Sequence, residues 1–172
     1  MDSHDLPGAV ERLLAAGNDE DGALTGALEL IAEGFAAKTA TVHAIDVSSD
    51  AERPDLVIVA DRGLPEAVRA HVRHIPFGKG MAGICAERRE PVTVCNLQTD
   101  DSGVVRPGAR QTGVAGAIVV PVLDAGGARL VGTLGIGKPG EHTYSDDERK
   151  VLARCAAALA PLLLARSGVK AG

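Results

Sequence analysis

The sequence predicts an α+β domain in which helices cover one face of a mainly antiparallel sheet. Two pairs of apolar, β-branched segments are each joined by a short polar turn, and such connections are typical of antiparallel strands. Amphipathic helical segments stand near both ends of the chain, where they would bury their apolar stripes against one face of the sheet. A length of 172 residues suggests one domain.

Two helices are expected in the first part of the chain. One carries Val10, Leu13 and Leu14 at helical spacing and ends near Gly17, since glycine suits a helix C-terminus. After the acidic segment NDEDG, an apolar stripe predicts an amphipathic helix that runs to about Lys38: Leu24, Leu28, Ile31 and Phe35. We take residues 1–22 as an N-terminal helical extension, 23–166 as the main domain and 167–172 as a flexible tail.

A hairpin and a third helix follow. Thr39–Val47 and Leu56–Ala60 predict two strands joined by a polar turn. A helix is expected from Leu64 to about His74, with Pro65 at its start, where the missing N–H is harmless. His71 and His74 could share a metal or haem face, but without a third ligand we expect both to be exposed.

The middle of the chain has a G-x-G-x-x-G spacing at Gly78, Gly80 and Gly83. A dinucleotide-binding loop would need a strand before it and a full-length helix after it. Here a helix precedes the glycines, and the short helix that follows, about Ala82–Arg89, is cut off by Pro91. We therefore expect the glycines to allow a tight turn, with a brief strand in PVTVCN.

The second half predicts a long loop and a second hairpin. Leu97–Gly113 is polar and has no period, and such a loop in a compact domain is usually functional or mobile. Ala117–Leu123 and Leu130–Ile136 flank the turn DAGGA and predict a hairpin. In its second strand, alternation puts Thr133, Gly135 and Gly137 on one face and directs Leu134 and Ile136 into the helix-covered core.

A closing helix ends the domain. Ser145 and Glu148 fit a capping box. Pro161 is expected to kink this helix or to end its regular part.

Composition narrows the function. The net charge is −5 and basic residues form no dense cluster, which disfavours nucleic-acid binding. No apolar run is long enough to span a membrane, and the N-terminus lacks a signal-peptide pattern, so a cytoplasmic protein is expected. Cys85, Cys95 and Cys155 form neither a disulfide framework nor a zinc motif; each is either a small buried hydrophobe or a redox residue.

The ordered segments resemble the GAF domain family. IPFGKGMAGICAERREPVTVCN is similar to its glycine turn, short helix and strand, GAIVVPVLDAGGARLVGTLGIG to its hairpin, and YSDDERKVLARCAAALAPLL to its closing helix. The resemblance covers about residues 23–165. It implies a GAF/PAS-like antiparallel sheet, with terminal helices on one face and a ligand pocket on the other. Asn96 stands where the family often has aspartate.

One catalytic branch of that family, the free methionine-(R)-sulfoxide reductases, is similar in IPFGKGMAG. In this resemblance, its cysteines fall at Val72, at Ala82 and in the loop near residues 106–112. Its two hairpin acids fall at Gly135 and Gly137. The chain departs from the branch at each of these positions, so a non-catalytic domain is expected.

The pocket is expected to take its walls from the glycine segment, the third strand, the loop and the bare strand face. That face is either a floor cleared for a ligand or a site of close packing. Arg106 and Arg110 could clamp a carboxylate or phosphate, whereas Phe77 and Met81 could equally be core. The candidate ligand-binding residues are Phe77, Met81, Cys85, Cys95, Asn96, Arg106, Arg110, Thr133, Gly135 and Gly137.

These observations favour a small-molecule sensor whose terminal helices form a homodimer and signal to a separate partner protein. Two alternatives stay open: a thiol-dependent enzyme that uses Cys85 or Cys95, and a ligand-free protein-interaction module. The sequence names neither the ligand nor a cofactor.

Overall fold

The computed structural model describes residues 5–17, 19–46 and 54–166. Within these residues the strands form one six-stranded sheet in the order β3-β2-β1-β6-β5-β4, and every neighbouring pair is antiparallel. The strands are β1 (Thr39–Ile45), β2 (Asp55–Arg62), β3 (His74–Pro76), β4 (Val92–Val94), β5 (Ala117–Leu123) and β6 (Leu130–Gly137). The predicted α+β fold is confirmed.

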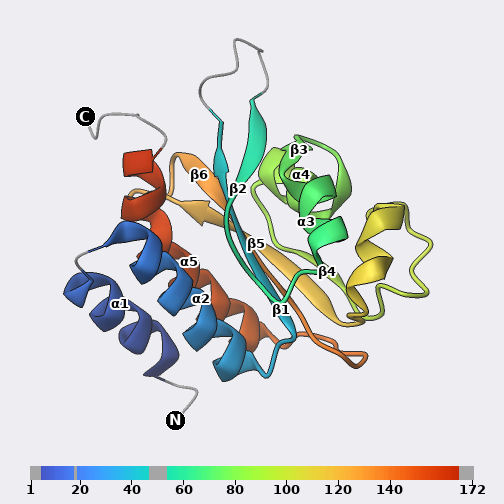
Figure 1. The fold of residues 1–172 in the computed structure, drawn as a ribbon, viewed down its shortest axis with the longest axis horizontal. Helices are drawn as coiled ribbons and strands as arrows, with labels where there is room; N and C mark the ends of the chain where they lie inside the picture. The colour runs from blue at the N-terminus through green and yellow to red at the C-terminus, as the bar shows by residue number, and fades with distance from the viewer. Residues whose placement is uncertain (1–4, 18, 47–53, 167–172) are drawn as a thin grey trace.

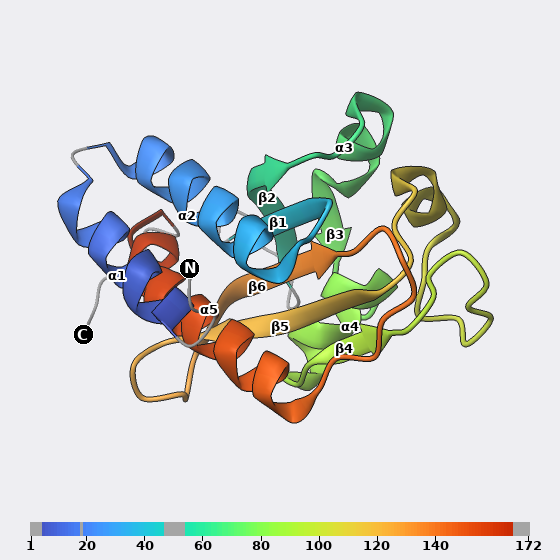
Figure 2. The ribbon, with the colours of Figure 1, turned by 90° about the horizontal axis from the view of Figure 1, so that it is seen from below.

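One face of the sheet is covered by the helices from the two ends of the chain (Figures 1 and 2). These are α1 (Leu6–Ala16), α2 (Glu20–Phe35) and α5 (Asp146–Arg166). Apolar side chains from the sheet, including Val42 and Leu134, join Leu28 and Leu159 of the helices in the largest core cluster. Leu6 of α1 belongs to the same cluster, so α1 shares the core of the domain.

The opposite face carries three shorter elements (Figure 2). They are α3 (Glu66–Val72), α4 (Gly80–Arg88) and the 3-10 helix η2 (Pro107–Thr112). The sheet therefore separates a thick helix layer, which holds the main core, from a thinner layer that covers only part of the other face.

Helix ends follow local rules. The Asp19 carboxylate accepts hydrogen bonds from the N–H groups of Asp21 and Gly22 and caps α2. Ser145 and Glu148 exchange hydrogen bonds of 3.0 and 3.1 Å, which confirms the capping box. Pro161 was expected to kink the last helix or to end its regular part. It does not end the helix, because α5 continues to Arg166 with Pro161 inside it, and the kink stays a prediction. Buried Leu159 and Leu163 hold the helix on both sides of the proline.

Two other expectations need correction. The third helix ends at Val72, and the next residues form the edge strand β3, whose single buried residue, Ile75, gave no periodic signal. The segment expected as loop throughout contains η2, which begins at Pro107. The expected end of the first strand at Val47, and the tail 167–172, lie outside the described residues.

Candidate functional site

The glycine turn between β3 and α4 is a structural device that places the start of α4. Gly78 and Gly80 have φ of +84° and +65°, a region that side chains disfavour. The Gly78 N–H donates a 2.8 Å hydrogen bond to the Gly83 carbonyl, and a Cβ on Gly83 would collide with the Pro76 carbonyl. The expectation of a tight turn with close backbone approach is confirmed.

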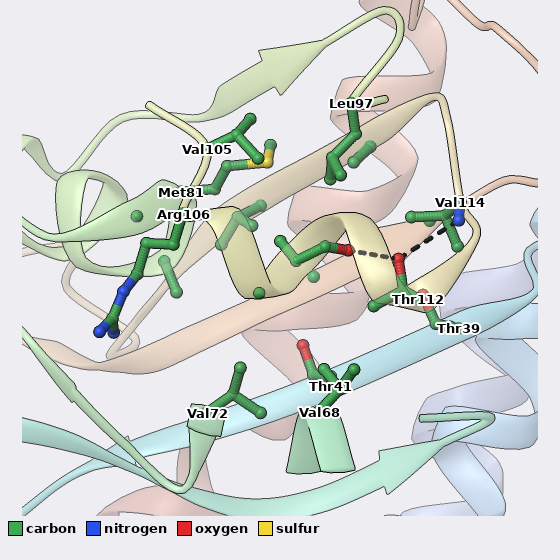
Figure 3. Close-up of a pocket in the computed structure, with 18 of the residues that line it drawn as sticks. Thr39, Thr41, Val68, Val72, Met81, Leu97, Val105, Arg106, Thr112 and Val114 are labelled. Atoms are coloured by element: carbon green, nitrogen blue, oxygen red, sulfur yellow. Dashed lines mark hydrogen bonds between the residues drawn. The ribbon is translucent and has the colours of Figure 1, made fainter. Parts of the chain in front are cut away.

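A cavity of about 450 Å³ lies between the sheet and the thinner layer. Its floor comes from the middle strands, and its roof comes from α3, the first turn of α4 and η2 (Figure 3). Thr41, Val68 and Val72 lie across it from Met81 and Val105. The wall comprises Thr39, Thr41, His43, Leu64, Val68, His71, Val72, Ile75, Lys79, Gly80, Met81, Ala82, Leu97, Val105, Arg106, Gly108, Ala109, Gln111, Thr112, Val114, Ala117, Val119, Gly135, Ile136 and Gly137.

Strand β6 presents its bare face to this cavity. Leu134 and Ile136 belong to the helix-side core, whereas Gly135 and Gly137 line the cavity, as the alternation predicts. Ile136 also contributes to the wall, and Thr133 does not. A Cβ on Gly135 would lie 3.1 Å from Thr41 Oγ1, and a Cβ on Gly137 would lie 2.8 Å from Thr39 Oγ1 and 2.9 Å from Val114 Cγ2. The floor therefore has more room at Gly135 than at Gly137.

The roof is fixed at the end of η2 by one hydroxyl. Thr112 Oγ1 donates to the Ala109 carbonyl at 2.7 Å and accepts from the Val114 N–H at 3.2 Å (Figure 3). Thr112 is buried. These bonds hold the side of the roof that packs against Gly137.

His43 is a wall residue that the sequence argument missed. It is 2% exposed, and burial lowers its pKa, although its hydrogen bond to Val72 acts in the opposite direction. Nε2 donates to the Val72 carbonyl at 2.8 Å, since a carbonyl can only accept. Nδ1 has no hydrogen-bond partner among the described residues. The sequence did offer one signal for this residue. Thr39, Thr41 and His43 alternate along β1, and alternate residues of a strand lie on the same face.

Four of the sequence-predicted residues lie in the cavity wall: Met81, Arg106, Gly135 and Gly137. Thr133 lies next to it, as the strand partner of His43, and its buried hydroxyl has no partner among the described residues. Arg110 lies outside the wall and donates to the Asp100 carbonyl at 2.9 Å.

The remaining candidates do not line the cavity. Phe77 packs with a cluster that includes Leu56. Cys85 is buried beside Val92 and Val119, and burial raises its thiol pKa to about 12. Cys95 is exposed, and Asn96 Nδ2 donates to Glu141 at 2.7 Å.

Neither a metal centre nor a membrane helix is found in the described part of the chain. His71 and His74 are both exposed, and only His71 is a wall residue. No group of three His, Cys, Asp or Glu residues could hold a metal ion in residues 5–17, 19–46 and 54–166. In the same residues, no helix is long and apolar enough to cross a membrane.

Comparisons with known proteins concern the fold and the family. No curated protein matches the chain significantly. Among solved structures, the GAF domain of a Coxiella burnetii phosphoenolpyruvate-protein phosphotransferase has a TM-score of 0.78 at 20% identity, covering 99% of this chain and 98% of that one. Free methionine-R-sulfoxide reductase from Neisseria meningitidis, solved with its substrate, has a TM-score of 0.74 at 21% identity, covering 97% and 92%.

A candidate GAF sensor protein from Burkholderia vietnamiensis has a TM-score of 0.75 at 18% identity, covering 96% of both chains. At these identities the structural likeness concerns the fold alone. The proteins that share this fold include both sensors and enzymes. The sequence model described as "GAF domain" matches residues 17–163. The chain belongs to the GAF domain family.

Proposed function

We propose that this GAF domain is a non-catalytic sensor that binds a small molecule in the cavity above β1 and β6. The cavity is the observation that carries the proposal. Its volume of about 450 Å³ suits a metabolite, because ligand pockets commonly measure roughly 300–1,000 Å³. Apolar residues such as Val68 and Val119 make up most of its wall, and a few polar groups stand among them, as is usual for such pockets.

The cysteine positions support a sensor over a thiol-dependent reductase. Val72 and Ala82, where the cysteines of the reductase branch fall in the resemblance, both line the cavity. Cys85 is buried outside the wall with a pKa raised by burial to about 12, and sulfoxide chemistry requires a thiolate. Cys95 is exposed and also outside the wall. No thiol of this chain therefore borders the proposed ligand.

The strands provide a route from the cavity to the terminal helices. On β1, Thr41 and His43 border the cavity, while Val42 between them is buried in the helix-side core. On β6, Gly135 borders the cavity between Leu134 and Ile136 of that core. A shift of either strand on ligand binding would therefore reach α2 and α5 directly. In this proposal the helix layer forms a homodimer and passes the change to a partner protein.

Native mass spectrometry of the purified chain tests the proposal. We expect a retained or added small molecule on the unmodified chain. Thr41→Phe should lose it, since this wall side chain lies at the centre of the floor in Figure 3. Thr93→Phe is the matched control, because Thr93 is an exposed strand residue outside the wall.

Two results would contradict the proposal. One is a chain that binds no small molecule in any preparation. The other is turnover of free methionine sulfoxide that stops in Cys95→Ser or Cys85→Ser. Sedimentation analysis checks the homodimer separately.

A further inference from the structure

The charged groups in the cavity wall are all basic. Lys79 and Arg106 are wall residues, and none of the described aspartates or glutamates is. Neither side chain has an ion pair with another described residue. Arg106 packs over Gly80, with its Cδ 2.9 Å from where a Cβ would be. In a chain of net charge −5, the wall thus has two exposed basic side chains and no carboxylate from the described residues.

Backbone donors reinforce that charge. Gly80, Met81 and Ala82 form the first turn of the nine-residue helix α4, and all three line the cavity. First-turn N–H groups have no partner within their own helix, and the N-cap residue Lys79 makes no side-chain cap. No other described residue accepts from these three N–H groups. A helix N-terminus of this kind favours an anion.

A second, independent polar group stands elsewhere in the wall. The buried His43 donates from Nε2 to Val72, which leaves Nδ1 as a hydrogen-bond acceptor without a partner among the described residues. The hydroxyl of Thr133, its strand partner, is also buried and unpaired within that part of the chain. Of the two, only His43 lines the cavity, and a ligand hydroxyl would satisfy its Nδ1, because a hydroxyl can donate one hydrogen bond.

We infer that the cavity selects a small organic anion, a carboxylate or phosphate ester with an apolar body and a hydroxyl group, and excludes amines. This inference rests on the proposed sensor function and specifies its ligand class. The anionic group lies against Lys79, Arg106 and the first turn of α4, and the hydroxyl lies at His43. The apolar body contacts Val68, Val72 and Met81 between them. An ammonium group finds no carboxylate to pair with among the described residues of the wall.

Ligand-observed NMR with the full chain tests the inference with matched probe sets. The sets are carboxylates, phosphate esters, alcohols and amines that share a phenyl, cyclohexyl or hydroxyphenyl body. We expect one or both anionic sets to bind, tighter with the hydroxyphenyl body than with phenyl, and the amines not to bind. Comparison of the two anionic sets distinguishes a carboxylate from a phosphate ligand.

Charge-removing variants localise the anion. The double variant Lys79→Gln/Arg106→Gln keeps side-chain length, and we expect it to weaken anion binding by about fivefold or more. Arg88→Gln/Lys150→Gln removes two exposed charges outside the wall and should bind normally. Circular dichroism verifies that both variants are folded.

The outcomes separate the inference from the proposed function. Amines or alcohols that bind as tightly as the anions, and that Thr41→Phe displaces, would overturn the ligand class and leave the sensor intact. Anions that bind the Lys79→Gln/Arg106→Gln variant with unchanged affinity would also overturn the ligand class and leave the sensor function intact. If no set binds and no molecule is retained on the purified chain, the sensor function itself is wrong.

Discussion

Alanine at Gly137 should destabilise the domain more than alanine at Gly135, although both glycines line the same cavity on the same strand. At Gly137 the new Cβ would lie 2.8 Å from Thr39 Oγ1 and 2.9 Å from Val114 Cγ2. Both neighbours are buried, at 6% and 3% exposure, so neither can move away freely. At Gly135 the nearest atoms are Thr41 Oγ1 at 3.1 Å and Val119 Cγ2 at 3.3 Å, and half-buried Thr41 borders open cavity space.

The magnitudes follow from two opposing effects. Overpacking a buried site costs about 1–3 kcal/mol, while replacing a strand glycine by alanine recovers about 0.5–1 kcal/mol. The free energy of unfolding should therefore fall by about 1–2 kcal/mol in Gly137→Ala and stay within about 0.5 kcal/mol in Gly135→Ala. For a chain of this size, the first change lowers Tm by about 2–8 °C.

Urea unfolding followed by circular dichroism measures both variants. An unchanged m-value would show that the free energies are comparable. Val114→Ala should relieve part of the cost of Gly137→Ala in a double-mutant cycle, because the two sites are in contact. If Gly135→Ala is the more destabilised variant, the distinction between an open and a packed part of the floor is wrong.

Three further predictions follow from the same structure. Native protein should show one thiol that reacts quickly with a maleimide at neutral pH, because Cys85 and Cys155 are buried with pKa values raised to about 12. Cys95→Ser should remove this fast reaction, and three fast thiols would contradict the burial of the other two. Because burial lowers the pKa of His43 from 6.5, the unfolded chain takes up its proton at a higher pH, and stability should fall as pH drops below 6.5. Urea midpoints at about pH 7.5 and about pH 5.5 should differ less in His43→Gln, and an unchanged difference would refute the role of His43. Asp19→Ala should lower the free energy of unfolding by about 1 kcal/mol through loss of the α2 cap. Asp101→Ala, at an exposed loop position, should leave the thermal midpoint unchanged. Equal effects of the two substitutions would contradict a stabilising cap at Asp19.

Strong periodicity made much of the fold predictable. Leu24, Leu28 and Ile31 are fully buried on α2, and the Ser145–Glu148 pair begins the closing helix as expected. Short elements were missed because a few residues carry no period. The start of the three-residue strand β3 was predicted as the end of a helix, and the residues of η2 were predicted as part of a polar loop.

The candidate site was harder to predict, because its wall joins residues from separate elements. The bare face of β6 could be identified, since alternation requires only its own sequence. On β1, small residues occupy both faces: Ala40 and Ala44 on the helix side, Thr39 and Thr41 on the cavity side. Size alone therefore could not reveal that His43 faces the cavity side. Arg106 reaches the wall and Arg110 does not, a difference that depends on where η2 begins.

Amide NMR of the full chain with the tightest-binding small-molecule probe tests the cavity most directly. The account predicts that the largest chemical-shift changes fall on the cavity wall, at Gly80, Met81 and Gly135, and extend to Leu134 and Ile136 beneath the floor. Changes confined to the surface of α1, or absent from β1 and β6 at saturation, would contradict a ligand site between the sheet and the thinner layer.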